Sequence, residues 1–382
     1  MKKLFLIILI CIPLIAQATP LYSPTWGFSL DLPDDYMYTD GDGRDRFSFV
    51  SPDGAVLDLV VYYAQSGRAA PYSSVEAMAA DVQRRIGSTG DVSVFDYHHK
   101  RAAIFDLTFI NPADGRTYMN GWGLALELEG AQNGNAPLLL ALSYGPAARQ
   151  GLMMLHLSVL DSIAPREADR LYPGPITEFA YPRETRISYP IWDIGEEAWF
   201  YAEDEEASQA LIEREFEVLL RYANSPYLED AWIRYYRTIY KDSYERLANA
   251  AFIIERKLNA PNSDSRAYAG LVLDWIQCFE YERNFDGSDF VNLVSAVIDG
   301  RGDCDTRAML WALILNYSNI QAAMMISPEY GHAMGLADLG GTGARFELEG
   351  RLLLVAETTA RIPLGLIAED MSNSDYWFGV RF

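Results

Sequence analysis

Three side chains in the last third of the sequence have the types and the order of a nucleophile, a general base and an orienting acid. Cys304 directly precedes a stretch with helical periodicity, and His332 and Glu357 follow it along the chain. The unpaired N–H groups at the start of a helix favour thiolate, the reactive form of cysteine. An imidazole can take the thiol proton, and a carboxylate can orient the imidazole. The sequence therefore predicts acyl-transfer chemistry with Cys304 as the nucleophile.

The elements that would position these side chains are indicated by hydrophobic periodicity. Asp303 is expected to cap a helix that begins at Cys304 and continues through the apolar positions Met309, Leu313 and Tyr317. Strands are expected over residues 332–339, 346–348 and 352–359, and His332 opens the first of them.

Glu357 lies among apolar neighbours in the last of these predicted strands. A carboxylate in such a place is unfavourable to bury without a partner, and an imidazole on a neighbouring strand would be that partner. The sequence therefore predicts a Cys304–His332–Glu357 triad.

Residues from about 265 to 375 resemble the transglutaminase-like core of the papain-related cysteine superfamily. The resemblance implies that Cys304 is the nucleophile, His332 the general base and acid, and Glu357 the orienting group. The family more often has aspartate at the third position. The matching segments are Asp274-Trp275-Ile276-Gln277 with Tyr281-Glu282, Gly302-Asp303-Cys304-Asp305 with Ala308, Gly331-His332-Ala333, and Glu357-Thr358-Thr359.

An oxyanion intermediate also needs hydrogen-bond donors. The backbone N–H of Cys304 is the first candidate. The resemblance implies that Gln277, on the preceding helix, could supply a second donor, and a structural role for Gln277 is the alternative.

Residues 22–165 show patterns typical of an antiparallel sheet with helical cover. Strands are predicted over 56–63, 92–97, 103–109, 118–128 and 138–144, with a tight hairpin turn at His98-His99. Ser73 and Glu76 form a capping-box pattern before a helix that ends at Gly87, and a second helix follows over 152–163. The order of these elements resembles PsbP-like domains, with Trp26-Gly27-Phe28 opening the segment and His156 to Ile163 closing it.

The remaining segments complete a prediction of class α+β. Residues 166–192 contain four prolines and little periodicity, so we expect a linker laid along a surface. Helices over 230–240, 244–258 and 265–282 are expected to form an extension of a transglutaminase-like domain at 193–382.

The N-terminus has the pattern of a secretory signal peptide over residues 1–18. Two lysines precede an apolar run from Leu4 to Ile15, and Ala16-Gln17-Ala18 provides a cleavage site. Ile10 stands before Cys11 where a lipoprotein signal would have a small residue, so lipidation is not expected. No later segment has 18 uninterrupted apolar residues, which predicts a soluble periplasmic or secreted protein without a membrane span.

Composition excludes several classes of partner. Without Lys2 and Lys3, 29 basic and 53 acidic residues remain, which gives a net charge of −24 and argues against nucleic-acid or anionic-membrane binding. Two cysteines, Cys278 and Cys304, do not make a disulfide scaffold, although a bridge between them stays open. No cluster of metal ligands is visible, so neither a cofactor nor a metal is predicted, and calcium dependence is left open.

The function predicted from these features is an exported cysteine-dependent enzyme that acts on amide or peptide bonds of a protein or peptide substrate in the cell envelope. The reaction would pass through a thioester, and hydrolysis is favoured over transamidation because many bacterial relatives are expected to be proteases or amidases. One alternative is a non-catalytic envelope binding or assembly protein that retains the fold. Another is a redox-sensing thiol pair formed by Cys278 and Cys304.

Overall fold

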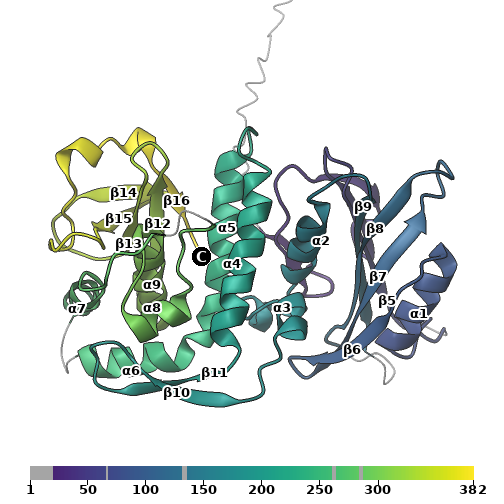
Figure 1. Ribbon diagram of the computed structural model, residues 1–382, viewed down its shortest axis with the longest axis horizontal. Coiled ribbons are helices and arrows are strands. Elements are labelled where there is room, and N and C mark those ends of the chain that lie inside the picture. Colours follow the sequence, from purple (N-terminus) through teal and green to yellow (C-terminus); the bar gives the residue numbers. More distant parts are fainter. Residues whose placement is uncertain (1–19, 66–67, 131–135, 260–263, 284–286) are drawn as a thin grey trace, which may run out of the picture.

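The computed structural model describes residues 20–65, 68–130, 136–259, 264–283 and 287–382 (Figure 1). The predicted signal segment 1–18, with Cys11, lies outside the described residues. Helices and antiparallel sheets together make up the described chain, so the predicted α+β class is confirmed. In the described residues, no helix is long and apolar enough to cross a membrane.

The first part of the chain forms a seven-stranded antiparallel sheet, here called the front sheet, in the order β3-β4-β5-β9-β8-β7-β6. Helix α1 covers one face and helix α2 the other (Figure 1). Apolar side chains alternate between the faces along the strands, which is why both faces need a helical cover. The elements are β3 (Met37–Gly41), β4 (Arg46–Val50), β5 (Val56–Tyr62), α1 (Val75–Ile86), β6 (Val92–Tyr97), β7 (Lys100–Ile110), β8 (Tyr118–Glu127), β9 (Leu138–Pro146) and α2 (Leu152–Asp161), preceded by the short ribbon β1 (Leu21–Tyr22) and β2 (Ser29–Leu30).

The β6–β7 hairpin and the start of α1 lie close to where the sequence predicts them. The hairpin turn between β6 and β7 is confirmed, and His98 and His99 both adopt left-handed backbone conformations there, with φ of 47° and 63°. The helix cap is displaced by one residue from the predicted Ser73, since the side chain of Ser74 accepts the N–H of Ala77.

The stretch 166–192, which the sequence predicts to be a linker laid along a surface, contains regular structure. Asp161 Oδ1 accepts the first N–H groups of a short helix, from Ile176 and Thr177, at 2.8 and 2.9 Å. Pro175 occupies the first helical position, where its missing N–H has no partner to lose. The elements are η1 (Glu167–Asp169), α3 (Pro175–Ala180) and β10 (Arg186–Pro190), which pairs with β11 (Glu197–Tyr201).

Two long helices, α4 (Asp204–Leu220) and α5 (Leu228–Arg246), stand between the front sheet and the second sheet (Figure 1). The buried Arg234 of α5 connects them to the front part of the chain. Its guanidinium donates to Glu215 Oε2 at 3.0 Å, to Ser158 Oγ at 2.8 Å and to the carbonyl of Asp31 at 3.0 Å. One side chain therefore contacts three separate segments.

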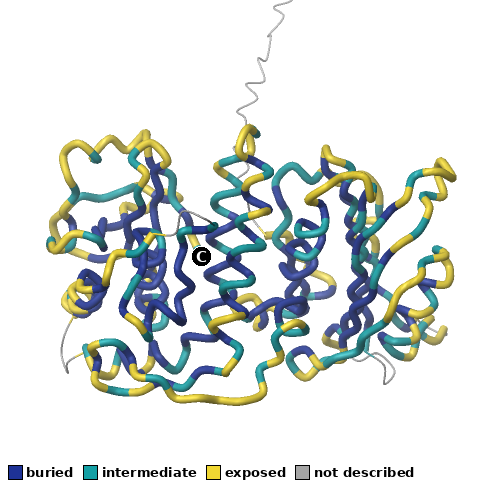
Figure 2. The backbone as a smooth tube through the Cα atoms, in the orientation of Figure 1, coloured by how far each residue is buried: buried dark blue, intermediate teal, exposed yellow. Residues whose placement is uncertain are grey.

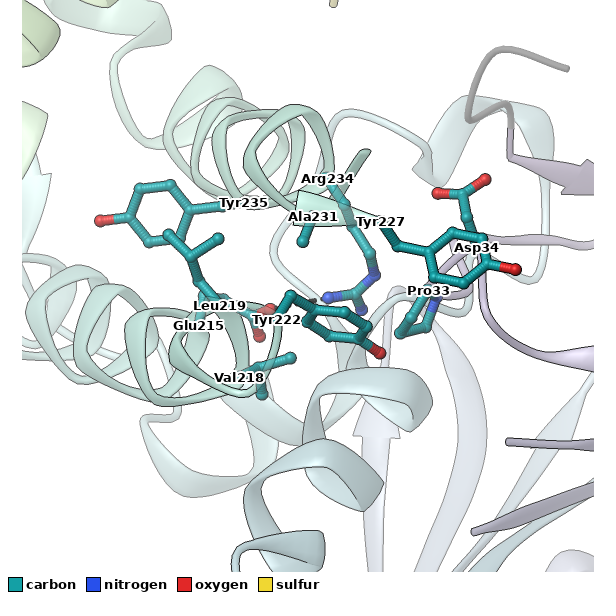
Figure 3. Close-up of a pocket in the computed structure, with 10 residues that line it drawn as sticks. All are labelled: Pro33, Asp34, Glu215, Val218, Leu219, Tyr222, Tyr227, Ala231, Arg234 and Tyr235. Atoms are coloured by element: carbon teal, nitrogen blue, oxygen red, sulfur yellow. Dashed lines mark hydrogen bonds and ion pairs between the residues drawn. The ribbon is translucent and has the colours of Figure 1, made fainter. Parts of the chain in front are cut away.

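A small cavity lies beside Arg234 (Figure 3). Its volume of about 10 Å³ leaves room for a single water molecule and not for a substrate. Asp34 lies at its edge, and the Oδ2 atom of Asp34 is buried without a hydrogen-bond partner among the described residues. Burial, together with Asp230 and Asp31, raises the pKa of Asp34 to about 6.

The last part of the chain forms a five-stranded antiparallel sheet, the C-terminal sheet, in the order β14-β15-β13-β12-β16. Helix α9 packs on β12 and β13, and almost all of its residues are buried (Figure 2). The further elements are α6 (Ala248–Leu258), α7 (Ser265–Ile276), α8 (Leu293–Asp299), α9 (Cys304–Tyr317), β12 (Ala322–Ser327), β13 (His332–Ala337), β14 (Arg345–Leu348), β15 (Arg351–Ala356), η2 (Glu369–Met371), η3 (Ser374–Tyr376) and β16 (Phe378–Val380).

Two element boundaries here correct the sequence predictions. The helix expected over 265–282 ends at Ile276, and Gln277 is its C-cap. The strand expected over 352–359 ends at Ala356, so Glu357 lies directly after the strand and not within it.

Candidate active site

Cys304 is the first residue of α9, as predicted, and Asp303 caps the helix by accepting the N–H of Thr306 at 2.8 Å. The loop before the helix packs tightly on Trp192. At Gly300, where φ is +67°, an added Cβ would lie 2.2 Å from that indole ring. Only glycine fits at this position. The loop therefore packs closely on Trp192, and Cys304, which follows it, is buried with 4% of its surface exposed.

The structure brings His332 and Glu357 together. His332 opens β13, which pairs with β15 so that Gly335 faces Ala356, the residue before Glu357. Nε2 of the imidazole lies 2.8 Å from Glu357 Oε2. The other oxygen of Glu357 accepts both the N–H and the hydroxyl of Thr359, at 2.7 and 2.6 Å. The carboxylate is thus held by donors on both sides.

These contacts determine whether the carboxyl group of Glu357 is ionised. Burial works to raise its pKa, but the hydrogen bond and charge of His332 and the two donors of Thr359 outweigh burial and lower the pKa below its ordinary value. Glu357 is therefore an anion that accepts a hydrogen bond. Since Nε2 of His332 must then carry a proton, Nδ1 is the free nitrogen of the neutral imidazole.

The sulfur of Cys304 lies next to the backbone at the beginning of β13. The backbone N–H of Ala333, the residue after His332, points to the sulfur and lowers the thiol pKa. Burial first, and then the carboxylates of Asp305 and Asp303, raise that pKa well above its usual range. The thiolate expected from the helix start alone is therefore outweighed, and Cys304 rests as a neutral thiol.

Asp305 is a site residue that sequence reasoning did not assign a role. Its Oδ1 lies 3.3 Å from Cys304 Sγ and accepts the thiol hydrogen bond, and its second oxygen, Oδ2, accepts the hydroxyl of Tyr236 on α5. Burial raises the pKa of Asp305. The only signal in the sequence was the position of this carboxylate directly after the cysteine. Helical periodicity does not predict that the side chain of Asp305 turns toward the thiol.

Gln277 lies beside the carboxylate loop. Its amide nitrogen donates to the backbone carbonyls of Glu357 at 2.8 Å and of Ile362 at 2.9 Å. Both amide hydrogens are therefore engaged in holding the segment after β15. A donor role toward an oxyanion, which the resemblance implies, stays a prediction and would require one of these bonds to be released.

Tyr281 is the aromatic side chain next to the thiol. It is half exposed, and burial followed by the neighbouring Cys304 raises the pKa of its hydroxyl to about 12. Arg307 lies over the Tyr281 ring at 5.5 Å and donates to the carbonyls of Gly302 and Phe279 at 2.9 and 2.7 Å. This buried arginine fixes the two loops that meet at the sulfur.

The remaining predictions about cysteine and metal chemistry concern the same region. Cys278 and Cys304 are both free; Cys278 is exposed and Cys304 is buried. The sequence suggested no metal-ligand cluster, but the fold places the carboxylates of Asp303 and Asp305 and the thiol between them within 4.8 Å of one another. Both carboxylates already accept hydrogen bonds from the protein, so we assign no ion to this group.

Comparisons with known proteins leave the family open. No family model and no curated protein matches the chain. Among solved structures, LpqN of Mycobacterium tuberculosis, which is involved in cell envelope biogenesis, is similar over 38% of this chain and 90% of its own, with 13% identity and a TM-score of 0.26. A protein of Bacteroides thetaiotaomicron is similar over 61% of this chain and 79% of its own, with 16% identity and a TM-score of 0.26. Likeness at this level identifies no function, and the transglutaminase-like and PsbP-like resemblances stay predictions.

Proposed function

We propose that the protein is a cysteine-dependent acyl-transfer enzyme that cleaves amide or peptide bonds. The observation that carries the proposal is the 2.8 Å contact between His332 Nε2 and Glu357 Oε2, at the start of the strand whose next N–H meets the Cys304 sulfur. The base and its orienting carboxylate are in contact, and the backbone next to the base reaches the nucleophile. This supports a nucleophile, base and carboxylate in the order that activates a thiol.

The reaction follows from the protonation states of the three groups. Nδ1 of His332 takes the proton of the neutral thiol while the sulfur attacks the substrate carbonyl carbon. The backbone N–H of Cys304, at the start of α9, stabilises the oxyanion. His332 then gives its proton to the leaving amine nitrogen as the C–N bond breaks, and a thioester remains.

A water molecule completes the cycle. His332 removes one proton from the water as the water oxygen adds to the thioester carbon. The C–S bond then breaks, His332 gives this proton to the leaving sulfur, and the acid is released with the thiol restored. We favour water over a primary amine as the second nucleophile, on the ground of the resemblance alone. With the signal-like segment 1–18, the substrate is a protein or peptide of the cell envelope.

The experiment is a search for cleavage products. Protein beginning at residue 19 is incubated with the cell-envelope fraction, and new N-termini are identified by mass spectrometry. We expect cleavage by the wild type and by Cys278→Ser, and none by Cys304→Ala or His332→Ala. Equal cleavage by Cys304→Ala would overturn the proposal.

A second candidate is a binding or assembly protein without turnover. It is supported by the thiol itself, which is 4% exposed and has a raised pKa. The two candidates differ in one product, because only the enzyme forms a covalent acyl adduct on Cys304. Acid quenching of the protein with an activated ester, followed by mass spectrometry of the peptide that contains Cys304, separates them.

A further inference from the structure

The thiol of Cys304 donates a hydrogen bond to the carboxylate of Asp305, which is not the carboxylate of the proposed triad, Glu357. Sγ lies 3.3 Å from Asp305 Oδ1, and the side chain of Asp305 is itself held by the hydroxyl of Tyr236 on its other oxygen. Tyr236 is fully buried in α5, so it fixes the carboxylate from outside α9. The acceptor of the thiol hydrogen is therefore a clamped side chain and not a mobile surface group.

The surroundings of this carboxylate are mostly acidic or neutral. Asp303 and Cys304 face it from the start of α9, Tyr236 from α5, Asp289 from the loop before α8, and His332 from β13. The thiol itself also lies within electrostatic range of the hydroxyl of Tyr281 and of the cations Arg283 and Arg307. A thiolate at Cys304 would stand 3.3 Å from the Asp305 carboxylate, whereas burial raises the pKa of the second carboxyl group, Asp303, well above its ordinary value. Repulsion between like charges at such distances disfavours ionisation of the thiol.

We propose that Asp305 is a positioning residue that keeps Cys304 protonated at rest by accepting its S–H hydrogen bond, and that substrate binding must turn this S–H from Asp305 to His332 before attack. The inference rests on the proposed function and adds a regulatory step to it. Asp305 neither gains nor loses a proton in the step. The thiol proton passes to Nδ1 of His332 and from there to the leaving amine.

A protonated resting thiol has a chemical benefit. Thiolates are the species that alkylating agents and oxidants attack. A site that forms its thiolate only with substrate in place is protected between turnovers.

The test measures the reactivity of the thiol without any substrate. In a Cys278→Ser protein that begins at residue 19, Cys304 is the sole thiol. Its alkylation by iodoacetamide is followed from pH 5 to 10 in the presence of EDTA. We expect Asp305→Asn to be alkylated at least about tenfold faster than the parent protein at neutral pH, which corresponds to a fall of one unit in the thiol pKa.

Asp289→Asn is the matched control, because it removes a nearby carboxylate that makes no hydrogen bond with the thiol among the contacts of the described residues. We expect its alkylation rate at neutral pH to rise by less than about threefold, which is half of that fall in pKa. An unchanged or lower alkylation rate in Asp305→Asn, or equal increases in the two variants, would overturn the role of Asp305.

A second measurement needs no substitution at position 305. The S–H stretching band of Cys304 in the Cys278→Ser protein should lie at lower frequency than that of a free thiol, as expected for a donor to a carboxylate. A band at the free-thiol frequency would overturn the proposal even if Asp305→Asn failed to fold. Since neither measurement depends on turnover, loss of cleavage in Cys304→Ala with an unchanged alkylation profile in Asp305→Asn would remove this inference and leave the proposed function standing.

Discussion

Gln277 donates to the backbone carbonyl of Glu357 at 2.8 Å, so the residue after α7 holds the peptide that carries the orienting carboxylate. The same amide nitrogen donates to Ile362 at 2.9 Å. The two bonds fix both ends of the segment that follows β15. Placement of the carboxylate beside His332 thus depends on a side chain 80 residues earlier in the chain.

Gln277→Ala should reduce stability. The substitution leaves two carbonyls without their donors, and each buried unpaired group costs about 1–3 kcal/mol. We expect the free energy of unfolding to fall by about 2–4 kcal/mol, measured by urea denaturation. An oxyanion role predicts the opposite signature, with unchanged stability and slower turnover.

Glu357→Gln should change the tautomer of His332. The wild-type carboxylate accepts a hydrogen bond from Nε2, whereas a glutamine amide can either donate or accept. The chain contains four histidines, so a two-bond ¹H–¹⁵N correlation spectrum can resolve this one. We expect a proton on Nε2 in the wild type, a mixture in the variant, and cleavage slower by two to four orders of magnitude. A wild-type imidazole with its proton on Nδ1 would contradict the proposed geometry.

Asp34→Asn should stabilise the protein at neutral pH but not at low pH. The folded pKa of Asp34, about 6, lies above its ordinary value of 3.8, so the folded state binds more protons than the unfolded state between these values. Stability from this group is present at low pH and is lost as pH rises through about 6. The carboxyl is partly open to solvent, so we expect a gain of only about 1 kcal/mol at pH 8 and none at pH 4, from urea denaturation. An equal gain at both pH values would contradict the burial of this group.

His99→Gly should stabilise the β6–β7 hairpin. His99 is exposed and has a φ of 63°, a conformation that costs a non-glycine residue about 1 kcal/mol or more. We expect a gain of about 1 kcal/mol in the free energy of unfolding. His98→Gly is the matched control: its φ is also positive, but the ring packs edge-on against Tyr97 and Tyr172, so the substitution loses contacts and should give no net gain.

The sequence predicts those elements that have a clear local pattern of apolar residues or a clear capping residue. Strand β6 matches the predicted bounds 92–97, and α9 begins at the predicted Cys304. Strand β12 was not predicted, because all six of its residues are buried and the pattern therefore does not alternate. Strand β16 is only three residues long, too short to show a period.

The candidate site shows a similar division between what local patterns reveal and what tertiary contacts decide. Residue types and order predicted that His332 and Glu357 would meet. The direction of the thiol hydrogen bond was not predictable, because it depends on Tyr236 of α5, 68 residues before Cys304 in the sequence. The prolines before residue 192 indicated irregular chain, but the carboxylate of Asp161 organises part of that stretch into α3. Contacts across long sequence separations decided each of these outcomes.

Arg234 also affects whether the two sheets unfold together or separately. If the front sheet and α2 separated from α4 and α5, this guanidinium would lose Ser158 and Asp31 and keep Glu215 as a partner. Each hydrogen bond lost by a charged group of this kind costs about 1.5–3 kcal/mol. The two sheets should therefore melt together, with a calorimetric enthalpy equal to the van't Hoff value, and act as one cooperative unit despite their separate cores.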